Sequence, residues 1–181
     1  MSEDLNKYLK DGQYQILLSE NEIKEKVREL GAQISKDYEG KCPILIGVLN
    51  GSFIFCADLF RNISIDCEVD FIKISSYGAA KETSGKIKVK KDIDAHLQDR
   101  HVIVVEDIVD SGYSVNYLKD RLQRVGPKSL KFVSLLVKEG AARTKYSIDY
   151  VGFKIPNHFV VGYGLDYAQK LRNLPAVYIM E

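Results

Sequence analysis

Apolar residues along the chain follow two kinds of spacing, and the two kinds alternate from one segment to the next. Apolar positions three or four residues apart predict amphipathic helices, whereas short continuous apolar runs predict buried strands. The first pattern predicts helices over residues 20–37, 53–61 and 113–125. The second predicts strands over 43–49, 67–75, 102–105 and 130–137, with shorter candidates at Val151, 159–161 and 177–179. Strands that alternate with helices predict an α/β fold with a mainly parallel central sheet covered on both faces.

Two segments add detail to this pattern. Ser19 and Glu22 have the spacing of a capping box at the start of the first helix, and Gly40 follows its predicted end. Residues 76–91 are polar, small and basic, without a clear period. They predict a long hairpin or mobile loop, of a length that is often found in active-site lids.

Composition narrows the class of protein. The chain has 181 residues, 45% of them hydrophobic, which predicts one domain over residues 1–181 with a sizeable core. A formal net charge of +1 does not favour nucleic acid or an anionic membrane as a partner. The polar N-terminus lacks a signal-peptide pattern, and no apolar run approaches the ~18 residues of a membrane helix. Three cysteines without a CxxC pair argue against a disulfide framework or a zinc site, so a cytoplasmic, reduced protein is expected.

The strongest candidate site lies at residues 102–114, which read VIVVEDIVDSGYS. An apolar strand is expected to end at Glu106 and Asp107, followed by Asp110 and a run of small and hydroxyl residues. Ligands of α/β sheets bind beyond the carboxyl ends of the strands. Backbone N–H groups and hydroxyls of such a loop hold a phosphate, and the acids hold ribose hydroxyls or a metal. A plain polar loop is the alternative, but three acids beside Ser-Gly-Tyr-Ser favour a sugar phosphate site.

Two common nucleotide motifs are missing. The sequence has no GxxxxGK[ST] motif, which excludes a P-loop NTPase. Gly162-Tyr163-Gly164 begins like the dinucleotide fingerprint GxGxxG, but Tyr167 occupies the position of its last glycine. A Rossmann dinucleotide site is therefore not expected.

The segment VVEDIVDSGYS strongly resembles the phosphoribosyl pyrophosphate (PRPP) motif of type I phosphoribosyltransferases. Other segments resemble the hypoxanthine-guanine phosphoribosyltransferases in particular. They are VLNGSFIFCADL at 48–59, SSYG at 75–78, LLVKEG at 135–140 and VGFKIPNHFVVGYGLDYAQKLRNLP at 151–175. The resemblance runs in order from about residue 10. It implies the type I phosphoribosyltransferase fold, with a central mainly parallel sheet and a small hood subdomain from N- and C-terminal segments.

The resemblance assigns roles within the PRPP motif. Glu106 and Asp107 would meet the ribose hydroxyls, directly or through Mg²⁺. The loop that would cradle the 5′-phosphate consists of Asp110, Ser111, Gly112, Tyr113 and Ser114. Asp110 would also be the general base at purine N7. Ser114 stands where the family usually has Thr, and it keeps the hydroxyl.

It also assigns the contacts of the base. Lys138 would donate to the exocyclic O6 of hypoxanthine or guanine, although a lysine at a strand end is more often a solvated charge. Phe159 would stack on the purine, although the hydrophobic pattern alone favours core packing. The backbone of Val160 and Asp166 would lie near the other edge of the base, with Asp166 as ligand of a second Mg²⁺. Arg172 would contact pyrophosphate, its alternative being an exposed helical arginine.

Two loops complete the implied site. Residues 49–51 match the pyrophosphate loop, where a cis peptide bond is expected between Leu49 and Asn50. Many relatives carry Lys where this chain has Asn50, so the resemblance supports backbone contacts of Asn50 and Gly51 more than a side-chain role. Ser76 and Tyr77 match the mobile loop that closes over the reaction and would exclude water.

The expected activity is transfer of 5-phosphoribosyl from PRPP to N9 of hypoxanthine or guanine, giving IMP or GMP and pyrophosphate in purine salvage. The resemblance implies a homodimer or homotetramer. One alternative is a PRPP-sensing regulator that binds RNA or DNA, which would need a basic surface that the net charge does not indicate. Another is an enzyme of the same superfamily that acts on xanthine or a pyrimidine. The sequence leaves the preference between hypoxanthine and guanine open.

Overall fold

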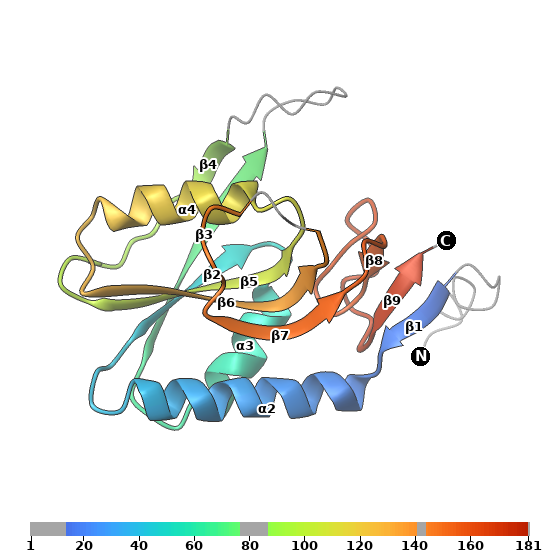
Figure 1. Cartoon of the computed structure of the whole chain (residues 1–181), viewed down its shortest axis with the longest axis horizontal. Coiled ribbons are helices and arrows are strands. Elements are labelled where there is room, and N and C mark those ends of the chain that lie inside the picture. Colours follow the sequence, from blue (N-terminus) through green and yellow to red (C-terminus); the bar gives the residue numbers. More distant parts are fainter. Residues whose placement is uncertain (1–13, 77–86, 141–143, 181) are drawn as a thin grey trace.

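Two β-sheets organise the part of the chain that the structure describes (Figure 1). The structure is a computed structural model, and it describes residues 14–76, 87–140 and 144–180. The larger sheet has six strands in the order β4-β3-β2-β5-β6-β7. These strands span Ile44–Leu49 (β2), Glu68–Ser76 (β3), Ile87–Lys91 (β4), His101–Val109 (β5), Ser129–Lys138 (β6) and Tyr150–Ile155 (β7). All neighbours are parallel except β3 and β4, which confirms the expected mainly parallel sheet.

Helices cover both faces of this sheet. Helices α2 (Glu20–Asp37) and α3 (Phe53–Asn62) lie on one face, and α4 (Tyr113–Gln123) lies on the other (Figure 1). Two separate cores follow from this arrangement, because alternate residues of a strand point to opposite faces. On β5, Ile103 and Val105 pack with α2 and α3, whereas Val102 and Val104 pack with α4. None of the described helices is long and apolar enough to cross a membrane.

The smaller sheet joins the two ends of the described chain. Its strands β1 (Tyr14–Leu18), β9 (Val177–Met180) and β8 (Val160–Val161) lie in that order and pair antiparallel. This sheet matches the hood subdomain expected from N- and C-terminal segments. The hydrophobic pattern did not predict β1, because its five residues become a strand only by pairing with β9 at the far end of the chain.

Strand β5 is longer than predicted. The apolar run suggested a strand that stops before Glu106 and Asp107, but β5 continues to Val109. Its pairing with β2 stops at Val105, whereas its pairing with β6 continues to Val109 and Val137. Backbone hydrogen bonds to β6 extend the strand regardless of the side chains it carries. The two acids therefore lie within a strand that has lost one of its two neighbours.

The segment expected as a loop over residues 76–91 is partly regular. Residues 87–91 form β4, which pairs antiparallel with β3, so the hairpin arrangement is confirmed and the expected loop is too long at its C-terminal end. Ser76 is the last residue of β3, and Tyr77 lies outside the described residues. The capping box of α2 is also confirmed, with the Glu22 N–H donating to Ser19 Oγ at 3.3 Å and the Ser19 N–H to Glu22 at 2.8 Å.

The base of the β3–β4 hairpin is held by the carboxylate of Asp70. It accepts hydrogen bonds from the backbone N–H groups of Phe71 (2.6 Å), Asp94 (2.7 Å) and Ala95 (2.8 Å). Burial acts to raise the pKa of Asp70, but these hydrogen bonds and that of Lys91 outweigh it, so the pKa is lowered. The carboxylate therefore stabilises the fold in its charged form.

Asp70→Ala is expected to lower the free energy of unfolding by about 2–3 kcal/mol at pH 7, because three N–H groups lose their acceptor. A carboxyl with a lowered pKa contributes fully above its unfolded pKa of about 4, and the contribution is lost as the pH falls through the folded pKa. Urea unfolding at pH 7 and pH 3 should therefore show a smaller difference between variant and wild type at pH 3. Asp94→Ala, whose side chain is 87% exposed, is the control with little effect. An equal difference at both pH values would contradict this role.

Candidate active site

The turn after β2 is tightly organised. Its first peptide bond, Leu49–Asn50, is cis, as expected. Ser52 is fully buried, and its hydroxyl donates to the Val48 carbonyl at 2.7 Å. The Cys56 N–H donates to the Ser52 carbonyl at 2.7 Å, so the turn continues directly into α3. The backbone of residues 50–52 is thereby fixed between a strand and a helix.

Asp107 lies against this turn. A Cβ atom added to Gly51 would lie 1.6 Å from Asp107 Oδ2, so a larger residue there would displace the carboxylate or the turn. The approach is possible because β2 leaves β5 after the Gly47–Val105 pair, and the turn then occupies the space beside Asp107. The other carboxylate oxygen accepts the Ile108 N–H at 2.9 Å. The structure therefore brings together the expected pyrophosphate loop and one of the two expected ribose acids.

The segment after β8 completes this side of the site. A Cβ atom on Gly164 would lie 2.1 Å from the Gly51 carbonyl oxygen, so the two backbones are in contact. Arg172 donates from Nη1 to the Gly164 carbonyl at 2.7 Å, and its Nη2 lies 2.8 Å from Asp166 Oδ1. The other Asp166 oxygen accepts the Gln169 N–H at 2.8 Å. Arg172 is only 18% exposed in a non-helical segment, so the interpretation as an exposed helical arginine is wrong.

The electrostatics of the two acids on β5 are unusual. Burial raises the pKa of Glu106 well above its ordinary value, and the charge of Asp107 adds to this effect. Burial also raises the pKa of Asp107, against the lowering effects of the Ile108 hydrogen bond and the Arg172 charge. Glu106 is 5% exposed, and its Oε1 has no hydrogen-bond partner among the described residues. Keeping both carboxyls charged costs free energy unless a further partner binds them. Carboxyls with pKa values raised in this way are common at functional sites.

These carboxylates fit Mg²⁺. The described residues contain no group of three or more potential His, Cys, Asp or Glu ligands. Mg²⁺ is usually bound by one or two carboxylates together with water and substrate phosphates, so a dedicated protein cage is not required. Glu106, which is buried and has an unpartnered oxygen, and the partly buried Asp107 next to it suit that mode.

The phosphate loop and the expected base contacts also meet. Asp110 is exposed, and its Oδ2 lies 3.2 Å from Nζ of Lys138, which ends β6 and is 11% exposed. Gly112 begins α4 at a φ of 79°, and a Cβ atom there would lie 2.3 Å from Thr144 Cγ2. Three other members of the predicted loop are exposed to solvent at the start of α4, namely Ser111, Tyr113 and Ser114. Lys138 is thus a paired and mostly buried cation, not a freely solvated one.

A cavity of about 440 Å³ lies beside the Asp110–Lys138 pair. Val109, Val137, Lys138 and Thr144 contribute to its wall. The space therefore connects the end of β5, the end of β6 and the segment that packs against Gly112. Of the residues expected to contact the base, Lys138 lines this cavity, whereas Asp110, Phe159 and Asp166 are not among its lining residues.

Phe159 is presented to solvent instead of the core. It is 49% exposed and makes an edge-to-face contact with Tyr167, at 6.2 Å between ring centroids and 87° between planes. Core packing, which the hydrophobic pattern favoured, is therefore wrong for Phe159. The next residue, Val160, is buried and pairs with Ile179 in the hood. An exposed aromatic ring directly before a paired strand can stack on a planar ligand.

Three residues of this site were not predicted from the sequence. Gly164 and Thr144 pack against site glycines, and Tyr167 supports the exposed ring of Phe159. A signal existed for the first of them, since the closely spaced pair Gly162 and Gly164 indicates backbone at positive φ, and the structure has 96° and 99° there. The same two glycines also begin a GxGxxG pattern, which points to a dinucleotide motif instead.

Comparison with known proteins agrees with this geometry. The phosphoribosyl transferase domain family matches residues 13–168. The hypoxanthine-guanine phosphoribosyltransferase of Bacillus subtilis is 43% identical over 166 residues, which cover 92% of each chain. The bifunctional protein TilS/HprT of Listeria monocytogenes is 45% identical over 166 residues, and the match spans 26% of that longer protein.

Solved structures show the same fold. A crystal structure of a hypoxanthine-guanine phosphoribosyltransferase from Bacillus anthracis is 48% identical with a TM-score of 0.88, and the match covers 92% of this chain and 98% of that one. A hypoxanthine phosphoribosyltransferase from Staphylococcus aureus is 36% identical with a TM-score of 0.90, covering 96% and 95%. The chain therefore belongs to the phosphoribosyl transferase family and, within it, to the hypoxanthine-guanine phosphoribosyltransferases.

Proposed function

We propose that the protein transfers the 5-phosphoribosyl group of PRPP to N9 of hypoxanthine or guanine, releasing pyrophosphate and giving IMP or GMP. The observation that carries this proposal is the Asp110–Lys138 pair, at 3.2 Å between carboxylate and ammonium, beside a cavity of about 440 Å³. The family membership supports the same reaction.

The two charged groups suit one edge of a 6-oxopurine. N7 and O6 are neighbours on that edge, so a base and a donor placed side by side can address both atoms. Lys138 has three donors and no acceptor, so it favours a 6-oxo group over the 6-amino group of adenine. Asp110 would accept the N7 proton as positive charge builds on the base during bond formation at N9. Phe159 would stack on the ring, with the backbone of Val160 and Asp166 near its other edge.

The opposite side of the site would hold the sugar and the leaving group. Glu106 and Asp107 would meet the ribose hydroxyls as the sugar becomes oxocarbenium-like. The backbone of Asn50 and Gly51 would contact pyrophosphate, with Arg172 nearby. Mg²⁺ held by Glu106 and Asp107, and a second Mg²⁺ held by Asp166, would supply positive charge that offsets the charge on pyrophosphate.

The phosphate loop would bind the 5′-phosphate of PRPP. Backbone N–H groups at the start of a helix bind phosphate well, and Asp110–Ser114 lead into α4. Four further expectations stay predictions. They are Ser76 and Tyr77 as residues of the closing loop, a homodimer or homotetramer, a single domain over 1–181, and a cytoplasmic location.

A panel of bases tests the proposal. The purified protein is incubated with PRPP and Mg²⁺ and separately with hypoxanthine, guanine, xanthine, adenine and uracil, and the nucleotide formed is quantified by chromatography. We expect product with hypoxanthine or guanine and at least about 100-fold less with adenine, because Lys138 cannot accept from its amino group. EDTA in place of Mg²⁺ is the control. Product only with xanthine or uracil would overturn the base assignment, and PRPP binding without any product would favour a sensor.

A further inference from the structure

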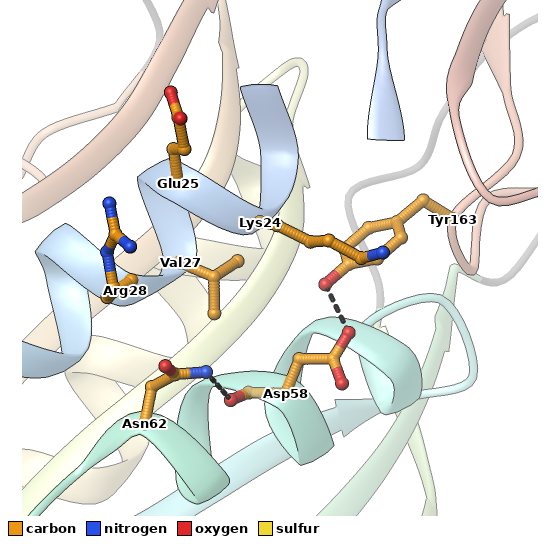
Figure 2. A pocket seen from close by; sticks show the side chains of 7 residues that line it. All are labelled: Lys24, Glu25, Val27, Arg28, Asp58, Asn62 and Tyr163. Atoms are coloured by element: carbon orange, nitrogen blue, oxygen red, sulfur yellow. Dashed lines mark hydrogen bonds between the residues drawn. The ribbon is translucent and has the colours of Figure 1, made fainter. Parts of the chain in front are cut away.

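A side-chain hydrogen bond joins the hood to α3, the helix that follows the expected pyrophosphate loop. The Tyr163 hydroxyl donates to Asp58 Oδ2 at 2.7 Å, and the ring is 7% exposed (Figure 2). Figure 2 shows the two side chains pointing toward each other across the gap between α3 and the segment after β8. The two residues are 105 positions apart in the chain, so this contact exists only in the folded protein.

Both partners are connected to the site by short, rigid links. Asp58 belongs to α3, whose first turn is bonded to the turn after β2 through the Phe53 N–H to the Asn50 carbonyl at 3.2 Å. Tyr163 precedes Gly164, whose backbone touches the Gly51 carbonyl. The Gly164 N–H also donates to the Arg172 carbonyl at 2.9 Å. The hydroxyl thus joins two elements that meet again at Gly51.

The backbone conformation of Tyr163 indicates that the segment after β8 depends on tertiary contacts such as the hydrogen bond to Asp58. Its φ of 49° lies in the left-handed region, which costs a residue other than glycine about 1 kcal/mol or more. Glycines with positive φ lie on both sides of it. A chain in this conformation keeps its position only when tertiary contacts maintain it. The main-chain bond from the Tyr163 N–H to Leu174 at 2.8 Å lies within the hood, whereas the hydroxyl bond ties the segment to α3.

We propose that Tyr163 and Asp58 are positioning residues for the pyrophosphate side of the active site: their hydrogen bond sets the distance of Gly164 and Arg172 from Gly51 and Asp107. This inference rests on the proposed function. It assigns neither residue a contact with substrate. Burial and the bond to Asp58 raise the pKa of the Tyr163 hydroxyl, so the tyrosine is the donor of this bond.

The surroundings make the contact testable without unfolding the protein. A cavity of about 280 Å³ between α2 and α3 borders the pair (Figure 2). The Asp58 side chain is 38% exposed, so solvent can reach the carboxylate once the tyrosine hydroxyl is removed. A Tyr163→Phe variant keeps the ring in place and should fold.

The chain offers a matched control at the amino ends of the strands, opposite to the ends that carry the site. Tyr150, at the amino end of β7, is 6% exposed and donates to Asp37 Oδ2 at 2.8 Å. Tyr150→Phe therefore removes the same kind of hydrogen bond from an equally buried ring, but away from the strand ends that carry the site. A merely structural role would make the two variants equivalent in every measurement.

The test compares KM for PRPP, KM for hypoxanthine, kcat and the thermal midpoint in wild type and variants. Tyr163→Phe should raise KM for PRPP about fivefold while KM for hypoxanthine stays within about twofold. Tyr150→Phe should lower the thermal midpoint by about as much as Tyr163→Phe does, and it should leave KM for PRPP unchanged. Asp58→Asn, which keeps an acceptor oxygen, should stay near wild type, and Asp58→Ala should match Tyr163→Phe.

The outcomes separate this inference from the function on which it rests. Wild type that forms no nucleotide from hypoxanthine or guanine overturns the proposed function before any variant is compared. Active wild type with the same KM for PRPP in Tyr163→Phe and Tyr150→Phe overturns the positioning role alone. Equal increases in the KM values for PRPP and hypoxanthine would also overturn it, because the effect would then not be confined to the pyrophosphate side.

Discussion

Asp110→Asn is expected to lower kcat by about 100-fold while KM for PRPP changes by less than about threefold. Asparagine has nearly the same shape and keeps an oxygen that can accept from Lys138, 3.2 Å away in the wild type. An amide oxygen cannot take up a proton at neutral pH, so the variant loses the acceptor for the N7 proton. The phosphate loop keeps its backbone, and PRPP binding should therefore persist. Initial rates at saturating hypoxanthine, with PRPP varied, give both constants.

Asp120→Asn serves as control for this experiment. Asp120 is an exposed acid of α4 that accepts a hydrogen bond from Tyr146 at 2.6 Å, away from Lys138. Both changes remove one negative charge from an exposed side chain. Only the change at Asp110 should affect kcat. Wild-type kcat in Asp110→Asn would remove Asp110 from the role of general base.

Gly51→Ala is expected to reduce kcat/KM for PRPP by at least about 100-fold, because a displacement of about 1 Å at an active site costs that much. The added Cβ would lie 1.6 Å from the Asp107 carboxylate, which no side-chain rotation of the alanine can relieve. Either the turn or Asp107 must move, and the Gly164 backbone that touches the Gly51 carbonyl must follow. The rate should therefore fall even where the variant remains folded. The thermal midpoint, recorded with the rates, separates misplacement from unfolding.

Gly40→Ala is the matched control for a glycine change. Gly40 has a φ of 69°, but a Cβ atom there would have no heavy atom within 4 Å. Alanine at this position should cost about 1 kcal/mol of stability through backbone strain and leave the kinetics unchanged. More than a tenth of wild-type activity in Gly51→Ala would show that the reaction does not depend on the contact between Gly51 and Asp107.

Both expected results depend on how the two sides of the site are held together. The base side is built from the ends of neighbouring parallel strands, β5 and β6, and is therefore part of the main sheet. The pyrophosphate side joins that sheet to the hood through the contacts of Gly51 with Asp107 and Gly164. Changes in the hood should consequently affect the binding of PRPP more than the contacts that we propose for Asp110 and Lys138 with the base.

Local signals in the sequence were sufficient for much of the fold. Helix α2 begins and ends where helical spacing and the Ser19–Glu22 capping box predicted, because these interactions lie within one or two turns. The mainly parallel sheet followed from alternating segments, because buried parallel strands need continuous apolar runs. Residues 106–114 were identified as the candidate site for the same reason: a phosphate-binding loop is a short, contiguous piece of chain.

The tertiary structure decided what depends on distant pairing. Strand β1 exists because Tyr14 pairs with Met180, and β5 extends past its acids because β6 continues beside it. Phe159 is exposed because the residue after it carries the pairing with the hood.

By itself, the sequence therefore determined the helices, the parallel sheet and the family, and it predicted the phosphate loop. Only the tertiary structure decided that Gly51 touches Asp107 and that Asp110 meets Lys138. Hydrophobic periodicity and capping act over a few residues, and these contacts join residues far apart in the chain, so no local pattern encodes their distances.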